Sequence, residues 1–264
     1  MRLITWNINS LRLRLPLLAR LVEEHAPDIV CLQETKVPDN LFPEDAIRSL
    51  GFTHRVYRGM KGYNGVAILS RRPIQPLDHA PDWCGRTDSR HVACAIEADG
   101  GPVILHDFYV PAGGDEPDPA LNDKYAHKLA FVDETTAWFR NHPPQRSILV
   151  GDLNIAPLEN DVWSHKQLLG VISHTPPETT RLEAWCANGF VDVMRKTVPA
   201  SEKLYTWWSY RNRDWKASNR GRRLDHVWMT PDLLPQYRGM QVLRDMRDWA
   251  SPSDHVGVIA DIDI

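Results

Sequence analysis

Three short polar fragments, each beside an apolar run, are the parts of this chain best suited to chemistry. They occupy residues 32–36 (LQETK), 151–154 (GDLN) and 253–255 (SDH), and Asn7 follows the apolar run 3–6 in the same way. Enzymes of α/β and α+β type gather active sites at such strand ends. Carboxylates suit a hard divalent cation, amides and imidazole suit phosphate oxygens, and a further carboxylate can activate water. The candidates for metal-assisted hydrolysis of a phosphodiester are therefore Asn7, Glu34, Asp152, Asn154, Asp254 and His255.

A second feature is the segment 207–223, in which basic and aromatic side chains are interleaved. Its charged residues are Arg211, Arg213, Lys216, Arg220, Arg222 and Arg223 against the single acid Asp214, and its rings are Trp207, Trp208, Tyr210 and Trp215. A charge run alone is typical of a solvated loop. The aromatic rings favour a nucleic-acid partner, because cations hold phosphates while flat rings stack on or wedge against bases. The formal net charge of −3 is a weaker guide than this local excess.

Length and composition indicate one domain spanning residues 1–264. Hydrophobic residues make up 42% and charged residues 25%, and no biased segment marks a linker. No apolar run approaches the roughly 20 residues that cross a bilayer, so we expect no membrane partner. The four cysteines lack the spacing of a zinc site or a disulfide framework, and the N-terminal residues do not resemble a signal peptide. We therefore expect a cytoplasmic protein.

The polar fragments must be positioned by strands, and the chain is rich in strand-like segments. These are residues 2–7, 29–33, 53–57, 65–70, 91–97, 102–109, 147–151, 225–230 and 256–262. Apolar residues at helical spacing predict two helices, one through residues 11–22 and one through residues 121–132 that ends before Pro143. The tight turn at 98–102 implies antiparallel pairing of its flanking strands, which favours an α+β sandwich over a uniformly parallel sheet.

Seven fragments give the chain a resemblance to a known family over nearly its whole length. They are residues 5–9 (TWNIN), 27–36 (PDIVCLQETK), 65–70 (GVAILS), 109–111 (YVP), 151–157 (GDLNIAP), 223–225 (RLD) and 253–255 (SDH). In this order and spacing they resemble the exonuclease III family of apurinic/apyrimidinic endonucleases, within the endonuclease/exonuclease/phosphatase superfamily. The resemblance implies an α+β or α/β fold: a four-layered α/β sandwich with two packed mixed sheets flanked by helices. It also implies Mg²⁺ as cofactor, with Mn²⁺ as a substitute.

Glu34 is the strongest single metal candidate, since a carboxylate at the end of a buried strand must be neutralised. The resemblance implies that Glu34 binds Mg²⁺ with Asn7 and Asp254 nearby. The residues alone leave open a salt bridge from Glu34 to Lys36 or to an arginine.

Asp152 and Asn154 are further candidate ligands and candidate catalytic residues. In the family this Asp positions and deprotonates the attacking water, and this Asn orients the water or the phosphate. On an extended chain the two side chains would project to one face about 7 Å apart. The alternative from the sequence alone is an Asx-turn that closes the strand.

His255 and Tyr109 complete the set of candidate catalytic residues. The resemblance implies that Asp225 pairs with His255, which raises the imidazole pKa and leaves the other ring nitrogen for a phosphate oxygen. His255 as general base, oriented by Asp225, stays open as an alternative, as does a purely packing role for this histidine. Tyr109 could hydrogen-bond the scissile phosphate or simply pack, and Asn9 could make a supporting contact.

The chain also departs from the family pattern. Ala112 stands where an amide commonly follows Tyr-Val-Pro, and Arg222 stands where the family places an aromatic or large aliphatic residue in the pocket for a base-less sugar. Trp207 and Leu224 still match apolar positions of that pocket. We expect Arg222 to reach a backbone phosphate, with pairing to a surface acid as the alternative. The predicted DNA-binding residues are Trp207, Leu224, Arg222, Arg220, Arg211, Arg90 and Lys36.

The favoured function is that of a Mg²⁺-dependent DNA repair phosphodiesterase. It would cut double-stranded DNA on the 5′ side of abasic sites, act as a 3′–5′ exonuclease, or do both, and we expect a monomer. Two alternatives stay open at this point: a non-catalytic nucleic-acid-binding module, and a superfamily phosphatase that acts on a phosphoester other than DNA. Segment 207–223 favours DNA over that second alternative.

Overall fold

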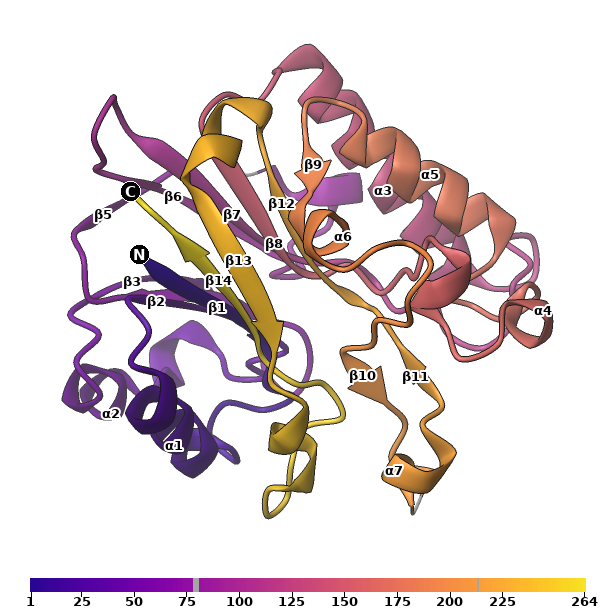
Figure 1. Cartoon of the computed structure of the whole chain (residues 1–264), viewed down its shortest axis with the longest axis horizontal. Helices are drawn as coiled ribbons and strands as arrows, with labels where there is room; N and C mark the ends of the chain where they lie inside the picture. Colours follow the sequence, from indigo (N-terminus) through magenta and orange to yellow (C-terminus); the bar gives the residue numbers. More distant parts are fainter. Residues whose placement is uncertain (78–80, 213) are drawn as a thin grey trace.

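Two six-stranded sheets packed face to face form the centre of the molecule (Figure 1). The computed structural model describes residues 1–77, 81–212 and 214–264, so Arg213 of the basic segment lies outside the described residues. In the order β13-β14-β1-β2-β4-β3, the first sheet contains β13 (Tyr237–Val242), β14 (Val258–Ile262), β1 (Arg2–Asn7), β2 (Ile29–Gln33), β4 (Val66–Ser70) and β3 (His54–Arg58). In the order β5-β6-β7-β8-β12-β9, the second contains β5 (Ile74–Pro76), β6 (His91–Ile96), β7 (Val103–Tyr109), β8 (Ser147–Asp152), β12 (Asp225–Met229) and β9 (Val191–Asp192).

Helices cover the outer face of each sheet. Side chains of α1 (Leu15–His25) and α2 (Glu44–Ser49) join the core under the first sheet, and those of α3 (Asp123–Asn141) and α5 (Pro176–Cys186) join the core over the second. The shorter helices are α4 (His165–Leu168), α6 (Val193–Thr197) and α7 (Trp215–Ser218), and the 3₁₀ turns are η1 (Asp39–Leu41), η2 (Trp83–Gly85), η3 (Glu159–Asp161), η4 (Pro231–Gln236) and η5 (Arg244–Asp248). The predicted four-layered sandwich with two mixed sheets is confirmed.

Alternation along the strands builds the layers. In β1, Leu3 joins the core between the sheets while Ile4 joins the core beneath α1. In β8, Ile148 and Val150 face the other sheet, whereas Leu149 packs on the α3 and α5 side. Both faces of these strands are buried, which explains why they read as continuous apolar runs.

Each sheet contains one parallel pair near its middle, β1–β2 and β7–β8, and its other pairs are antiparallel. The carboxyl ends of the four parallel strands bring Asn7, Gln33, Tyr109 and Asp152 to one edge of the sandwich. The antiparallel register of β12 on β8 then sets Asp225 opposite Asp152 at that edge. The sheets therefore bring together residues that lie far apart in the sequence.

A small hairpin of β10 (Trp207–Trp208) and β11 (Gly221–Arg222) projects away from both sheets beside this edge, with α7 at its tip (Figure 1). The hairpin belongs to the predicted basic and aromatic segment. Within the described ranges, no helix combines the length and apolar character that a membrane span requires.

The nine strand-like segments all coincide with observed strands to within a few residues, and the predicted antiparallel pairing across 98–102 is confirmed. The helix boundaries differ more. The first helix begins at Leu15 with Pro16 in its first turn, so Leu11 precedes it. The second begins at Asp123 because the Asn122 side chain caps it, which leaves Leu121 outside the helix and exposed.

Candidate active site

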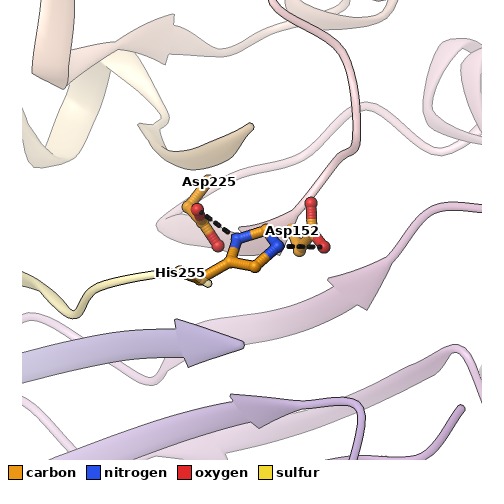
Figure 2. Close-up of side chains that lie close together, drawn as sticks. All are labelled: Asp152, Asp225 and His255. Atoms are coloured by element: carbon orange, nitrogen blue, oxygen red, sulfur yellow. Dashed lines mark hydrogen bonds and ion pairs between the residues drawn. The ribbon is translucent and has the colours of Figure 1, made fainter. Parts of the chain in front are cut away.

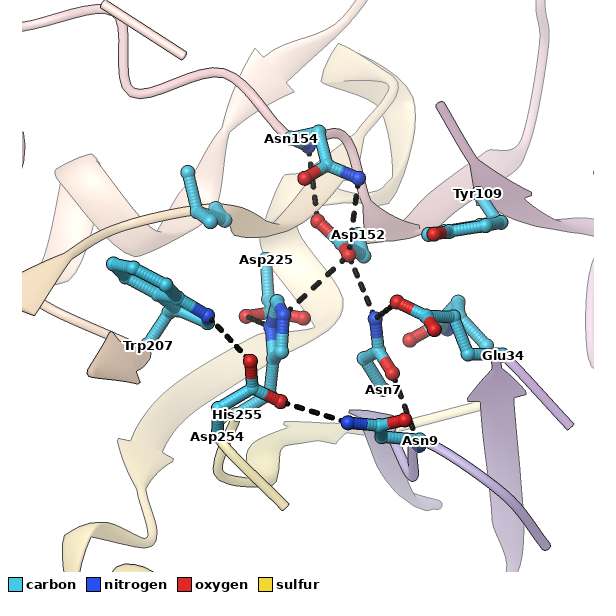
Figure 3. A network of polar contacts seen from close by, with 12 residues as sticks. Asn7, Asn9, Glu34, Tyr109, Asp152, Asn154, Trp207, Asp225, Asp254 and His255 are labelled. Carbon is cyan, nitrogen blue, oxygen red and sulfur yellow. Dashed lines mark hydrogen bonds and ion pairs between the residues drawn. The ribbon is translucent and has the colours of Figure 1, made fainter. Parts of the chain in front are cut away.

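The polar ends of both sheets meet in one network (Figure 3). Its centre is the Asp152 carboxylate at the end of β8, which is fully buried. Around it lie Asn7, Asn9, Glu34, Tyr109, Asn154, Trp207, Asp225, Asp254 and His255. A buried carboxylate needs hydrogen-bond donors or a positive charge beside it, and the network supplies both.

His255 lies between two carboxylates (Figure 2). Its Nδ1 is 2.8 Å from Oδ2 of Asp225, and its Nε2 is 3.6 Å from Oδ2 of Asp152. Each of the three residues offers an atom within 4.8 Å of the others, and all three side chains are buried. The expected contact between Asp225 and His255 is thus present. The second ring nitrogen is directed to Asp152.

This arrangement shifts both pKa values. Burial would lower the pKa of His255, but Asp225 and then Asp152 outweigh it and raise the pKa to about 10. Burial raises the pKa of Asp152 to about 7, against the opposing effect of His255. Because the two groups interact directly, their protonation is linked. Near neutral pH the histidine is the proton donor of the pair, and Asp152 is poised to gain or lose a proton.

Asn7 joins the two sheets at the site. Its Nδ2 donates to Oε1 of Glu34 at 2.9 Å and to Oδ2 of Asp152 at 2.8 Å. Its Oδ1 accepts the backbone N–H of Asn9 at 3.1 Å, which fixes the orientation of the amide. Asn7 is fully buried, and its side chain links the carboxylates of Glu34 and Asp152.

Glu34 lies just after β2 in the left-handed backbone region, with φ 52°. Its Oε2 accepts Nζ of Lys36 at 2.8 Å, so the salt bridge left open by the sequence is formed. Burial would raise the pKa of Glu34, but Lys36 and the Asn7 hydrogen bond hold it below its usual value. The carboxylate is ionised and attracts a cation.

The oxygen atoms at this end of the network fit a hard divalent cation. Carboxylate oxygens of Glu34 and Asp152 are of the type that Mg²⁺ prefers. Asn7 directs Nδ2 to both carboxylates and its amide oxygen to the backbone N–H of Asn9. Asp254 lies on a different branch of the network. It accepts Nε1 of Trp207 at 2.9 Å and Nδ2 of Asn9 at 3.2 Å, and Asn9 links its carboxylate to the Asn7 side chain.

The expectation of an extended Asp-x-Asn pair is wrong. Strand β8 ends at Asp152, and Asn154 has a left-handed φ of 54°. Oδ1 of Asp152 accepts the backbone N–H of Asn154 at 2.9 Å, which is the Asx-turn that the sequence left as the alternative. The turn brings Nδ2 of Asn154 to 3.2 Å from Oδ2 of Asp152, so the two side chains touch directly.

Tyr109, at the end of β7, is buried beside the carboxylates. Burial, then Glu34 and Asp152, raise its pKa well above the usual value, so the phenol keeps its proton. The Arg90 guanidinium carbon lies 5.0 Å from the centre of the Tyr109 ring. A protonated phenol held this way can donate a hydrogen bond.

The predicted DNA-binding residues fall into separate places. Trp207, Arg211, Arg220, Arg222 and Leu224 line a cavity of about 580 Å³, together with Glu34, Asn154, Asp254 and His255. Arg90 lines a neighbouring cavity of about 540 Å³ that shares Ala112 and contains Tyr109. Lys36 lies beside Glu34, one of the candidate metal ligands. The two cavities flank the catalytic candidates.

The basic side chains of segment 207–223 do not all lie on one exposed surface. Arg223 is fully buried, with Nε 2.6 Å from Oδ1 of Asp161 and Nη1 2.7 Å from Oδ2 of Asp192. It is a core residue, so its inclusion in a nucleic-acid-facing run was wrong. Lys216 is exposed and pairs with Asp248.

Arg222 forms no ion pair among the described residues, which removes the alternative of a surface acid partner. Ala112 is exposed and lines both cavities, and its side chain has no amide group to contact a phosphate.

Sequence reasoning missed Lys128. Its ammonium is fully buried on α3, 2.5 Å from Oε1 of Glu178, and donates to the carbonyls of Asn154 at 2.8 Å and Ala112 at 3.2 Å. It thereby ties two active-site loops to the helical layer. Its position three residues after Tyr125 on the apolar face of the helix was the available signal.

Comparison with known proteins agrees with this geometry. A model of the endonuclease/exonuclease/phosphatase family matches residues 4–255. The chain belongs to this family. Exodeoxyribonuclease III of Haemophilus influenzae is 29% identical over 270 residues, which cover 99% of each protein. The family predicted from the seven fragments is confirmed.

Solved structures of the family show the same fold. An AP endonuclease from Archaeoglobus fulgidus superimposes with a TM-score of 0.91 at 30% identity, covering all of both chains. A 3′ phosphatase from Neisseria, bound to a product DNA hairpin, gives a TM-score of 0.89 at 29% identity, again over both whole chains.

Proposed function

We propose that this protein is a metal-dependent DNA repair phosphodiesterase acting as one catalytic domain over residues 1–264. The observation that carries the proposal is the Asp152 carboxylate, contacted by His255 on one side and by Asn7 on the other at the shared edge of both sheets. The relatives described above are an exodeoxyribonuclease, an AP endonuclease and a 3′ phosphatase bound to DNA. The hydrolase and DNA repair class predicted from the sequence is confirmed by these relatives.

The side chains divide the work of hydrolysis. Asp152, with its pKa near 7, accepts a proton from the attacking water. His255, kept protonated by Asp225, donates from Nε2 to a phosphate oxygen and offsets the negative charge that develops there. Tyr109 donates a further hydrogen bond to the phosphate, and Asn154 orients the water. The water oxygen joins phosphorus and the bond from phosphorus to the 3′ oxygen breaks. The 3′ oxygen leaves as a hydroxyl after it takes a proton from solvent water.

In the alternative mechanism, His255 is the general base that accepts the proton from the attacking water. The raised pKa of His255 favours the first assignment, since an imidazole that is already protonated cannot act as a base. The contact with Asp225 supports the same reading, because a buried carboxylate stabilises the imidazolium.

The proposed cofactor is Mg²⁺, with Mn²⁺ as a substitute. Glu34, Asn7 and Asp152 would hold it, and Asp254 and Asn154 remain the other proposed ligands. When bound, the cation supplies positive charge beside the phosphate. It would compete with Lys36 for Glu34, which already carries a negative charge at neutral pH.

The proposed substrate is double-stranded DNA with an abasic site or a 3′ end. Arg211 and Arg220 are exposed at the cavity beside His255, where they can hold backbone phosphates, and Trp207 and Leu224 give that cavity an apolar wall. Arg90 would contact the strand on the other side of Tyr109. We keep a monomeric, cytoplasmic protein as part of the proposal.

The two alternative functions have weaker support. A binding module without catalysis has no need of a buried Asp152 with a shifted pKa, which costs stability. A phosphatase for a small phosphoester has no need of exposed arginines along both cavities. DNA hydrolysis accounts for both features.

A cleavage panel tests the proposal. The protein is incubated with abasic duplex, intact duplex with a recessed 3′ end, and RNA of the same sequence, each with Mg²⁺ and with EDTA. We expect 3′-hydroxyl products from at least one DNA substrate with Mg²⁺ and none with EDTA. Binding of DNA without cleavage under any metal condition would favour the non-catalytic module. Cleavage of neither DNA, with turnover of a small phosphoester, would favour the phosphatase.

A further inference from the structure

Arg222 introduces a positive charge into the pocket wall beside the catalytic histidine. It lies opposite Trp207 in the β10–β11 hairpin, and this cross-strand pairing places its guanidinium carbon 5.2 Å from the centre of the Trp207 ring. The same cavity contains His255 and Leu224. The guanidinium therefore covers part of the apolar surface on which a neutral sugar would pack.

Only one nitrogen of the Arg222 guanidinium, Nη1, donates hydrogen bonds to the described residues. Nη1 donates to Oγ of Ser173 at 2.7 Å and to the carbonyl of Ile172 at 3.0 Å. Nε is buried without a hydrogen-bond partner, and Nη2 donates to no other group among the described residues. No carboxylate forms an ion pair with Arg222 there, and Glu178, whose charge acts on it, is already paired with Lys128. An unpaired, partly buried cation in a cavity is a site for an anion.

The anchor of Arg222 is itself rigid. The backbone N–H of Ser173 donates to both carboxylate oxygens of Glu178, at 3.0 and 2.9 Å, and Glu178 pairs with the buried Lys128. The guanidinium is thus fixed before any ligand arrives, which reduces the entropy that binding must overcome.

Two of the three acids that line the cavity are engaged by other groups, and the third, Asp115, is exposed to solvent. Glu34 accepts Lys36 and Asn7, and Asp254 accepts Trp207 and Asn9. Arg211 and Arg220 also line the cavity and add positive charge. An anionic group that enters therefore meets an Arg222 that forms no ion pair with any carboxylate of the described residues.

We propose that Arg222 is a specificity-determining residue that selects 3′ ends whose fragment beyond the scissile phosphate carries its own negative charge. This inference rests on the proposed function, because it places that fragment in the cavity beside His255. Hydrolysis follows the same balance as before: water oxygen bonds to phosphorus, the phosphorus–3′ oxygen bond breaks, and the fragment leaves as a phosphate monoester. A carboxylate on the fragment pairs with the guanidinium, and an uncharged group of equal size does not.

Two nicked duplexes that differ only in charge test the proposal. One ends in a 3′-phosphoglycolate, and the other ends in the corresponding neutral glycolamide. We expect the wild-type protein to prefer the carboxylate by about tenfold or more in kcat/KM, the range of a charge-assisted hydrogen bond. Arg222→Gln should bring the ratio close to one by slowing only the carboxylate substrate, and Arg222→Lys should keep part of the preference.

Arg220→Gln is the matched control, because it removes an exposed arginine from the same cavity. It should change both rates together and leave their ratio intact. A ratio that Arg222→Gln leaves unchanged would overturn the proposal. Equal loss on both ends with a flatter salt dependence would overturn it as well, and would assign Arg222 to the DNA backbone.

The wild-type protein separates this inference from the proposed function. Hydrolysis of both ends at equal rates would contradict the inference alone. Hydrolysis of neither end with Mg²⁺ or Mn²⁺ would contradict the proposed function and the inference with it. If Arg222→Gln does not fold, the wild-type ratio and Arg222→Lys decide the matter.

Discussion

Nδ1 of His255 lies 2.8 Å from Oδ2 of Asp225, although 30 residues separate the two in sequence. Asp225 opens β12, whose register on β8 sets it opposite Asp152. His255 lies three residues before the start of β14 in the other sheet. The contact therefore spans the two sheets. It keeps a charged imidazole directed at Asp152, and most of the proposed chemistry depends on it.

The first prediction concerns this pair as a unit. We expect His255→Ala and Asp225→Ala each to reduce kcat by roughly 10²-fold or more, and the double variant to be little slower than the worse single variant. The reason is that Asp225 acts only through the imidazole. Single-turnover rates of the wild-type protein, the two single variants and the double variant form a double-mutant cycle. If the rate reductions of the single variants multiply in the double variant, the two residues act independently.

The second prediction is the protonation state of His255. In the metal-free protein its imidazole should remain protonated at pH 8, because Asp225 and Asp152 raise its pKa to about 10. NMR titration of the ring checks this, and Asp225→Asn should lower the pKa by more than one unit. An imidazole that titrates near 6.5 in the wild-type protein would be inconsistent with the geometry.

The raised pKa has a consequence for stability. Its contribution is fully present below the unfolded value of about 6.5 and is lost as pH rises through about 10. Between pH 7 and pH 10.5 the wild-type Tm should therefore fall further than that of His255→Gln. Parallel curves would show that the charge of His255 does not contribute to folding.

The third prediction separates two arginines of one segment. Arg223→Gln should lower the free energy of unfolding by about 3–5 kcal/mol, because it leaves the buried Asp161 with only Arg195 as an ion-pair partner among the described residues and removes the ion pair of the half-buried Asp192. Arg220→Gln, at an exposed position, should leave it nearly unchanged. Urea denaturation of both variants provides the comparison, and equal effects would show that burial does not distinguish the two arginines.

The fourth prediction addresses the metal. Glu34→Gln keeps the Asn7 hydrogen bond geometry but removes the charge, so it should raise the Mg²⁺ concentration needed for half-maximal rate. Lys36→Met should do the reverse, because the ammonium no longer competes for the carboxylate. Rates across a Mg²⁺ titration measure both. A titration curve unchanged in Glu34→Gln would remove Glu34 from the proposed ligands.

Much of the fold could be predicted because the strands are buried on both faces. Their continuous Val, Ile and Leu runs identify them without knowledge of their partners. Strand β13 was missed for the opposite reason: it is a partly exposed edge strand with Gly239, Arg238 and Gln241 in it. Helix α5 was missed because its first turn contains two prolines and its apolar face is short.

The site was predictable in membership more than in geometry. Their positions at the ends of apolar runs identify Asp152, Asn154 and Glu34. The sequence did not decide between an extended backbone and the Asx-turn that joins Asp152 to Asn154. The fate of Arg223 depends on Asp161 and Asp192, which lie 62 and 31 residues away. Nothing in a basic run distinguishes the one arginine that long-range ion pairs bury.

The role of Asp152 as proton acceptor is tested most directly by the Asp152→Asn variant, measured for cleavage and for binding on the same DNA. The amide preserves the shape of the side chain but cannot take the proton of water. We predict that kcat falls roughly 10²- to 10⁴-fold with Mg²⁺ while the Kd for the uncleaved duplex changes little. Turnover close to that of the wild-type protein, in a variant that binds DNA normally, would contradict the central claim that Asp152 accepts the proton from the attacking water.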